Sequence, residues 1–375
     1  MKVLIVTGIW PPDVGGPASH APEVAEFLRG RGHEVEVVTT APAPPAPEEY
    51  PVRWISRAQP VLLRYLRGAL LVRQAARGAD VVYSTGMYGR TRVGSLLAGR
   101  RSVVKLTGDP AYERALRYGL TRLPIETFQR SHDLRLAWLK VVRDLTLWGA
   151  HRYVIPSASL GALADEWHLV RGDRIVVLPN PISVPQLETR DVLRTRHGFE
   201  GPTLVFAGRL SLQKSLDVAL RAVAACDGVT LVLAGDGPER PRLDALVTEL
   251  GIGGRVRFLG AQPRTAVFDL LAAADAELLS SGWENFPHSL VEGLAVGTPV
   301  ISTGVGGVGE IVTDGVNGLL VPPGDPEVLA AAIRRFFADE ALQARLRTAA
   351  PGSVARFAPE PVYARLEELL VEARG

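Results

Sequence analysis

The sequence predicts an α/β protein made of two doubly wound domains, each with a parallel sheet covered by helices on both faces. Three observations lead to this fold class. Short, almost continuously apolar segments alternate with helical patterns along the 375 residues, as parallel strands and their covering helices do. Pro179, Pro181 and Pro185 interrupt both patterns near the middle of the chain. The length allows a large buried core in each of two domains.

The first half of the chain contains five segments with the pattern of buried strands. Helical patterns, including 22–31 and 61–77, separate them. The first segment follows a single lysine and lacks a small-residue cleavage site, so we expect a first strand rather than a signal peptide. The five segments are Lys2–Gly8, His33–Thr40, Ala79–Thr85, Ser102–Gly108 and Arg152–Ser157.

The second half contains six more such segments, and no strand pattern follows the last one. They are Thr203–Leu210, Val229–Gly237, Arg255–Gly260, Ala276–Ser281, Pro299–Thr303 and Gly318–Gly324. We therefore expect one domain at 1–182 and another at 183–353, with a C-terminal helix at about 354–375 that packs back onto the first. Two such domains facing each other would form a cleft, because open parallel sheets bind ligands beyond the carboxyl ends of their strands.

Composition narrows the class of protein. Hydrophobic residues make up 47% and charged residues 22%, which is typical of a globular protein, and the net charge of +2 does not call for nucleic acid. Cys226 is the only cysteine, so disulfides are excluded and a reducing cytoplasm is expected. No apolar run has the length of a membrane span. The histidines lack metal-ligand spacing, so we expect no metal.

The helical segment 61–77 alternates leucine and valine with four arginines, and it contains no acid. Such a helix can rest on an anionic membrane surface, which would make the protein peripheral to the membrane. The commoner alternative, which we favour, is a helix that faces the core and exposes a basic side. The oligomeric state stays open.

Two acids follow the strand-like segment Ala276–Ser281. Glu284 lies in a loop, and Glu292 lies more than a turn inside a helix whose first turn contains Pro287. The free N–H groups near His288 and Ser289 favour an anion such as a phosphate. An anion with an acid on each side suits a sugar nucleotide, with Glu292 on the ribose and Glu284 on the hexose. The alternative is that both acids are solvated surface residues.

Two cations, Arg209 and Lys214, follow another predicted strand. Arginine can hold a diphosphate through its planar fork, and lysine can hold it as a point charge. Ordinary surface cations are the alternative. Lysine occurs only four times in the chain, which draws attention to Lys214.

Further loops follow strands in both halves. Gly235 belongs to a Gly-Asp-Gly turn, and backbone groups near Phe258 and Leu259 suit contact with a nucleobase. Gly15 and Gly16 follow the first strand, where glycine lets backbone approach a ligand. Asp109, just after a fourth strand, is either a ligand-binding residue or the N-cap of a helix.

These residues resemble the motifs of the retaining glycosyltransferases of family 4, which have the GT-B fold of two Rossmann-like domains. The family's E-x7-E motif matches Glu284 to Glu292, its G-R-L-x-x-x-K motif matches Gly208 to Lys214, and its G-x-G-P-E turn begins at Gly235. The resemblance covers nearly the whole chain and is most specific in the second domain.

The resemblance implies an enzyme of the EC 2.4 class that moves a sugar, with retained configuration and without a metal, from a nucleoside-diphosphate sugar to a hydroxyl acceptor. It places the acceptor in the first domain and the donor, with UDP or GDP as leading bases, in the second. Many members have a histidine where this chain has Asp109. The implied catalytic residues are Glu284, Asp109, Arg209 and Lys214. The implied donor-binding residues are Gly15, Gly16, Arg209, Lys214, Gly235, Phe258, Leu259, Glu284, Asn285, Phe286, Pro287, His288, Ser289, Leu290 and Glu292.

Two other functions fit the same architecture. A UDP-sugar 2-epimerase also binds a nucleotide sugar between two such domains, although the E-x7-E motif argues against it. A non-catalytic subunit that only binds a nucleotide sugar is the second alternative. The acceptor, an unidentified glycan, lipid-linked sugar or small molecule, is left open by the sequence.

Overall fold

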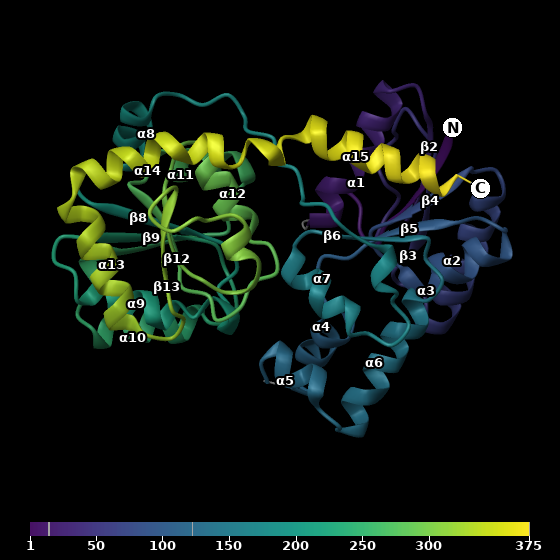
Figure 1. The fold of residues 1–375 in the computed structure, drawn as a ribbon, viewed down its shortest axis with the longest axis horizontal. Helices are drawn as coiled ribbons and strands as arrows, with labels where there is room; N and C mark the ends of the chain where they lie inside the picture. Colours follow the sequence, from purple (N-terminus) through teal and green to yellow (C-terminus); the bar gives the residue numbers. More distant parts are fainter. Residues whose placement is uncertain (14–15, 122, 375) are drawn as a thin grey trace. The chain divides into compact units, whose positions relative to one another are not determined.

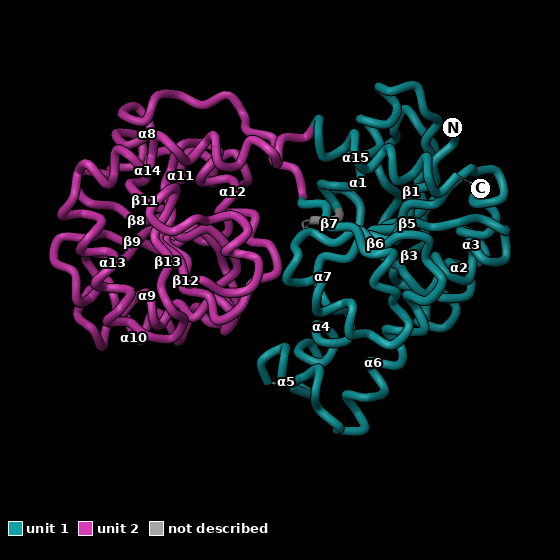
Figure 2. The backbone as a smooth tube through the Cα atoms, viewed as in Figure 1, with its two compact units in different colours: residues 1–179, 360–375 teal, residues 180–359 magenta. Residues whose placement is uncertain are grey.

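The computed structural model describes residues 1–13, 16–121 and 123–374. The chain divides into two compact units (Figure 2), one formed by residues 1–179 and 360–375 and the other by residues 180–359. The expected boundary after residue 182 thus lies three residues beyond the observed one.

Unit 1 is built on a parallel sheet of seven strands in the order β3-β2-β1-β4-β5-β6-β7 (Figure 1). The five strands expected from the sequence are present, and β3 and β7 are additional. Both additional strands lie at edges of the sheet, where residues stay partly exposed and the apolar pattern weakens. The strands are β1 (Lys2–Val6), β2 (Glu34–Ala41), β3 (Val52–Ser56), β4 (Val81–Ser84), β5 (Ser102–Lys105), β6 (Arg152–Ile155) and β7 (Ile175–Val177).

Helices cover both faces of this sheet. One face packs against α1 and α15, whose apolar residues share a core cluster with β1 and β4, and the opposite face packs against α2. The helices of unit 1 are α1 (Gly16–Gly30), α2 (Val61–Arg77), α3 (Tyr88–Leu97), α4 (Pro110–Arg117), α5 (Ile125–Arg130), α6 (Leu134–Leu147), α7 (Ala158–Asp165) and α15 (Pro359–Ala373).

The C-terminal helix joins unit 1 through a helical stripe of buried residues that includes Val362, Leu366 and Leu369. The Tyr363 hydroxyl donates a hydrogen bond of 2.7 Å to Glu23 on α1. The helix begins at Pro359 and not near 354 as expected. Residues 355–357 form a separate 3-10 turn, and its Phe357 is buried in the core of unit 2.

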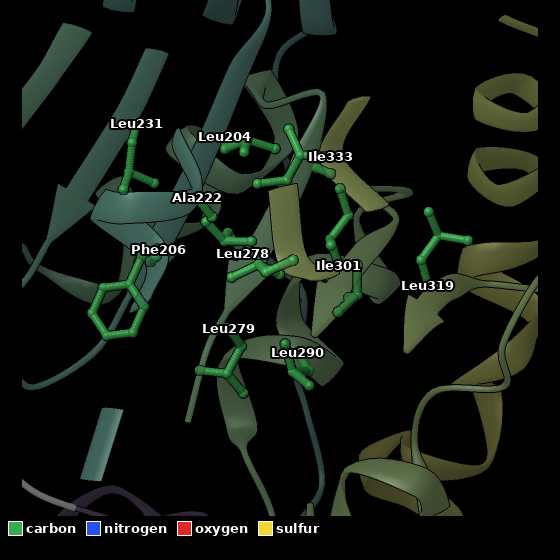
Figure 3. Packing of buried hydrophobic residues seen from close by; sticks show 14 of the residues in the cluster. Leu204, Phe206, Ala222, Leu231, Leu278, Leu279, Leu290, Ile301, Leu319 and Ile333 are labelled. Atoms are coloured by element: carbon green, nitrogen blue, oxygen red, sulfur yellow. The ribbon is translucent and has the colours of Figure 1, made fainter. Parts of the chain in front are cut away.

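Unit 2 is built on a parallel sheet of six strands in the order β10-β9-β8-β11-β12-β13, and all six were expected from the sequence. Central strands β8, β11 and β12 are fully buried, and Figure 3 shows the packing of Phe206, Leu278 and Ile301 from these strands. The strands are β8 (Thr203–Ala207), β9 (Thr230–Ala234), β10 (Val256–Gly260), β11 (Ala276–Leu279), β12 (Val300–Thr303) and β13 (Gly318–Val321). The helices are α8 (Arg190–His197), α9 (Leu216–Ala224), α10 (Arg240–Glu249), α11 (Arg264–Ala273), α12 (His288–Ala295), α13 (Pro326–Ala338) and α14 (Glu340–Ser353).

Helix α2 faces the core as expected, through Val72, Ala75 and Ala76, which pack against the sheet. It also buries the small residues Gly68 and Ala69, and α3 packs closely against it. The large residues Leu62 and Leu66 are instead 72% and 53% exposed. None of the described helices has both the length and the apolar character needed to cross a membrane.

Candidate active site

Four loops meet at the carboxyl edge of the second sheet, because the four strands that precede them are neighbours in the order β9-β8-β11-β12. The loops comprise residues 208–215, 235–239, 280–287 and 304–310. Backbone hydrogen bonds join the loops. The N–H of Leu210 donates to the carbonyl oxygen of Asp236 at 3.0 Å, and the N–H of Gly282 donates to that of Gln213 at 2.8 Å. The N–H of Gly307 donates to the carbonyl oxygen of Glu284 at 3.1 Å. The loops therefore form one connected surface.

Two glycines permit this close approach of backbone to backbone. A Cβ atom at Gly235 would lie 1.8 Å from the carbonyl oxygen of Gly208, and a Cβ atom at Gly306 would lie 1.9 Å from that of Glu284. Both glycines also have positive φ, 153° and 50°. Gly235, predicted to bind a donor, thus has a structural reason to be glycine.

Glu284 and Lys214 form an ion pair on this surface. The Lys214 Nζ lies 2.5 Å from Glu284 Oε1, and the side chains are only 15% and 6% exposed. The Ser281 hydroxyl donates to the same oxygen at 2.5 Å, and the Gln213 amide donates to Oε2 at 3.4 Å. Glu284 is therefore a buried, fixed carboxylate and not the solvated surface acid of the alternative.

Arg209 lies in the same loop as Lys214, between β8 and α9, and its side chain is exposed. Within the described part of the chain its guanidinium makes no ion pair or hydrogen bond, in contrast to Lys214. Its five donors are therefore available to an anion from solution.

Helix α12 begins directly after this loop. Pro287 is its N-cap and makes no side-chain hydrogen bond to the first turn. His288 is exposed and its Nε2 lies 2.7 Å from the Asn180 amide nitrogen. Phe286 and Leu290 are buried in the core of unit 2, so only their backbone groups could meet a ligand.

Glu292 faces Arg264 on α11, with 3.1 Å between Oε1 and Nε, and its side chain is 12% exposed. Burial raises the pKa of the Glu292 carboxyl, and the Arg264 guanidinium opposes that rise. Arg264 went unnoticed in the sequence because it stands alone at the start of a helix, without a motif.

Two family models together match nearly the whole chain. The model "Glycosyl transferases group 1" matches residues 190–352, and "Glycosyl transferase 4-like domain" matches residues 15–181. The chain belongs to the group 1 glycosyltransferases. The resemblance seen in the motifs is thereby confirmed.

Relatives of this glycosyltransferase agree with that assignment. The lipopolysaccharide core biosynthesis glycosyltransferase LpsE of Rhizobium meliloti is 43% identical over 147 residues, which are 39% of this chain and 43% of LpsE. That match therefore spans less than half of the relative. Glycogen synthase of Mycobacterium tuberculosis is 27% identical over 93% of this chain and 89% of its own length.

The fold is that of solved GT-B structures. The structure of Anabaena HepE in complex with UDP superposes with a TM-score of 0.80 over 99% of this chain and all of HepE, at 23% identity. The expected GT-B architecture of two Rossmann-like units is thereby confirmed.

The structure of this glycosyltransferase also contains a carboxyl group that sequence reasoning missed. Glu277, on β11, is 1% exposed and lies beneath α12. The available signal was an acid within the otherwise apolar segment Ala276–Leu279.

The two residues predicted near the base lie on the edge strand β10. The Arg240 guanidinium stacks 4.0 Å from the centre of the Phe258 ring. The carbonyl of Leu259 accepts a hydrogen bond from Gln262 at 2.7 Å, while Gly260 accepts one from Gly235 at 2.8 Å. The end of β10 thus joins the connected surface.

In unit 1, Asp109 is the N-cap of α4 and accepts a hydrogen bond from the N–H of Ala111 at 2.8 Å. Its other oxygen accepts hydrogen bonds from Gln129 at 2.5 Å and from Arg143 at 2.9 Å. The side chain has no exposed surface. These contacts favour the structural alternative, and a direct contact of Asp109 with a sugar stays an untested prediction.

The remaining predicted residues of unit 1 precede or begin α1. Gly15 lies outside the described residues, and Gly16 is the first residue of the helix. Among the residues that the structure describes, no group of three potential metal ligands occurs.

Proposed function

We propose that this glycosyltransferase moves a sugar from a nucleoside-diphosphate sugar to a hydroxyl acceptor, with retention of the anomeric configuration and with no metal ion. One observation carries the proposal. The Lys214–Glu284 ion pair lies on the loop surface that leads into the N-terminus of α12, with Arg209 in the same loop as Lys214. Two cations, a helix N-terminus and a fixed acid therefore meet at one edge of the sheet.

The diphosphate would lie against the first turn of α12. The helix N-terminus carries a partial positive charge, and the exposed Arg209 adds a full one. The ammonium group of Lys214, although paired with Glu284, has further N–H donors for a phosphate oxygen. These groups stabilise negative charge that grows on the diphosphate as it leaves, which is the task that a metal ion performs elsewhere.

The two acids would bind the two sugar rings. Glu292 sits one turn inside α12 and can accept hydrogen bonds from the ribose hydroxyls. Glu284 can accept one from the transferred sugar through Oε2, which accepts a long hydrogen bond of 3.4 Å from Gln213, whereas Lys214 and Ser281 both lie 2.5 Å from Oε1. The structure of HepE with UDP-glucose makes UDP the first base to test.

In the reaction, the bond from the anomeric carbon to the diphosphate oxygen breaks while the bond to the acceptor oxygen forms on the same face. The acceptor proton goes to the leaving diphosphate. The sugar carries positive charge in the transition state, which the fixed carboxylate of Glu284 stabilises.

A panel of radiolabelled UDP- and GDP-sugars tests this function in water, without acceptor. Slow hydrolysis of one donor that Glu284→Gln abolishes is the expected result. Formation of the 2-epimer would identify an epimerase, and binding without any turnover would identify a non-catalytic subunit. Addition of EDTA should leave the hydrolysis rate unchanged.

We also propose that α2 contacts an anionic membrane surface. Val61, Leu62, Leu66 and Leu70 are 72%, 72%, 53% and 58% exposed, and the four arginines of the helix are not balanced by any acid within it. Sedimentation with phosphatidylglycerol vesicles should capture the protein, whereas phosphatidylcholine vesicles should not. The double variant Leu62→Ser, Leu66→Ser should no longer be captured. Leu96→Ser, at an exposed leucine of α3, is the matched control. Equal capture of wild type, the double variant and the control would contradict the proposal.

A further inference from the structure

Glu277 lies inside the sheet, close to the residues of the candidate site. It pairs in register with Val205 of β8 and Val300 of β12, both apolar neighbours. Neither carboxylate oxygen has a hydrogen-bond partner among the described residues, although the group is 1% exposed. A buried carboxyl group without partners is costly, so its retention needs a reason.

Gly293 on α12 provides the space for this carboxyl group. A Cβ atom at position 293 would lie 2.4 Å from Glu277 Oε2, well inside van der Waals contact. Helix α12, which carries Ser289 and Glu292, therefore packs directly on the Glu277 carboxyl group at Gly293.

Charged and polar groups face Glu277 from three sides. Helix α12 contributes the Ser289 hydroxyl and Glu292, the loop after β8 contributes Lys214, and the loop after β11 contributes Glu284. The Ser289 hydroxyl is close enough to favour the charged form of Glu277 but does not reach hydrogen-bonding geometry. Glu277 is thus coupled to every charged group that we place near the donor except Arg209.

We propose that Glu277 is a positioning residue for the donor site, which supports the first turn of α12 as a neutral acid and weakens donor binding when it ionises. The inference rests on the proposed function, because it concerns the same anion site. A negative charge beneath the helix N-terminus opposes the partial positive charge on which the diphosphate depends. The charge would also compete with the donor for Lys214.

The electrostatics of the site make this ionisation accessible near neutral pH. Burial raises the pKa of the Glu277 carboxyl to about 8. Ser289 and Lys214 partly oppose this rise. Glu292 and Glu284 add to it. Between pH 7 and 9.5 the group therefore passes from mostly neutral to mostly charged.

Calorimetric titration with UDP and GDP between pH 7 and 9.5 tests the proposal. Glu277→Gln keeps the shape of the neutral acid but cannot ionise, and Glu249→Gln, at the exposed end of α10, is the matched control. We expect wild type and Glu249→Gln to lose about tenfold in affinity across this range, as a unit charge near the site would cause. Glu277→Gln should bind UDP and GDP as wild type does at pH 7. Its affinity should change by less than about twofold up to pH 9.5, because the amide cannot acquire the negative charge.

Parallel pH profiles of wild type and Glu277→Gln would overturn the inference while leaving the proposed function intact. Absence of UDP and GDP binding to all three proteins would overturn both. Gly293→Ala provides a second test if Glu277→Gln fails to fold. Its methyl group displaces the Glu277 carboxyl group, so the affinity for UDP at pH 7 should fall at least about fivefold. A loss of this size is within the range for a misplaced charged group. Wild-type affinity in Gly293→Ala would contradict the supporting role.

Discussion

The ammonium group of Lys214 and the carboxylate of Glu284 are 2.5 Å apart, although seventy residues separate them in the chain. The pair joins the two loops that follow β8 and β11, adjacent strands of the second sheet. The residue expected to hold the diphosphate and the residue expected to hold the transferred sugar therefore fix each other's position before any ligand arrives.

Lys214→Ala should weaken binding of nucleoside diphosphates by about tenfold to a hundredfold, the range for loss of one charge-assisted hydrogen bond. It should also leave Glu284 buried without its cation, so the melting temperature should fall. Calorimetry with UDP and GDP measures the first effect. An affinity unchanged from wild type would show that Lys214 serves Glu284 alone.

Glu284→Gln should reduce turnover by at least about a hundredfold, because the amide cannot stabilise positive charge in the transition state. UDP affinity should change by less than about fivefold, since the diphosphate contacts other groups. Donor hydrolysis and calorimetry on the same preparation separate the two effects. A joint loss of affinity and rate would instead assign Glu284 to the diphosphate.

Glu277→Gln should alter the pH dependence of stability. An acid whose pKa is raised on folding stabilises the protein at pH values below its unfolded pKa, and this contribution is lost as pH rises towards the folded pKa of about 8. Relative to wild type, the variant should therefore gain free energy of unfolding between pH 5 and pH 8, on the order of 3 kcal/mol. Urea unfolding at both pH values measures the gain, and a constant difference would refute the raised pKa.

Asp109→Ala should lower the free energy of unfolding by about 3 kcal/mol, because it removes the N-cap of α4 and leaves Arg143 buried without this partner. Asp109→Asn should lose less, since asparagine also caps helices. UDP affinity should stay at the wild-type value in both. Wild-type stability together with loss of turnover would restore the catalytic assignment of Asp109.

The central strands of the second sheet could be predicted because they are buried on both faces and read as continuous apolar runs. The edge strands β3 and β7 of the first sheet could not, since exposure on one side dilutes that pattern. The exposure of the leucines on α2 was also not predicted. The periodicity of this segment predicts a helix, but small residues at the contact with α3 help to decide which side of the helix is buried.

The site was predictable as a set of residues and not as a set of contacts. Glu284, Glu292, Arg209 and Lys214 stand in recognisable motifs after strands. The partners Arg264 and Gln213 come from other segments and carry no motif. Glu277 escaped notice because a single acid in a strand is indistinguishable, in sequence, from one at a solvated edge.

The packing of α15 with α1 brings residues 1–179 and 360–375 together in unit 1, with unit 2 as a continuous insertion between them. During translation the core of unit 1 lacks α15 until the residues after 359 have emerged, whereas residues 180–359 emerge earlier. Removal of the final sixteen residues would therefore uncover apolar surface at the opposite end of the sequence, and a fragment of residues 180–359 is the natural unit for separate expression.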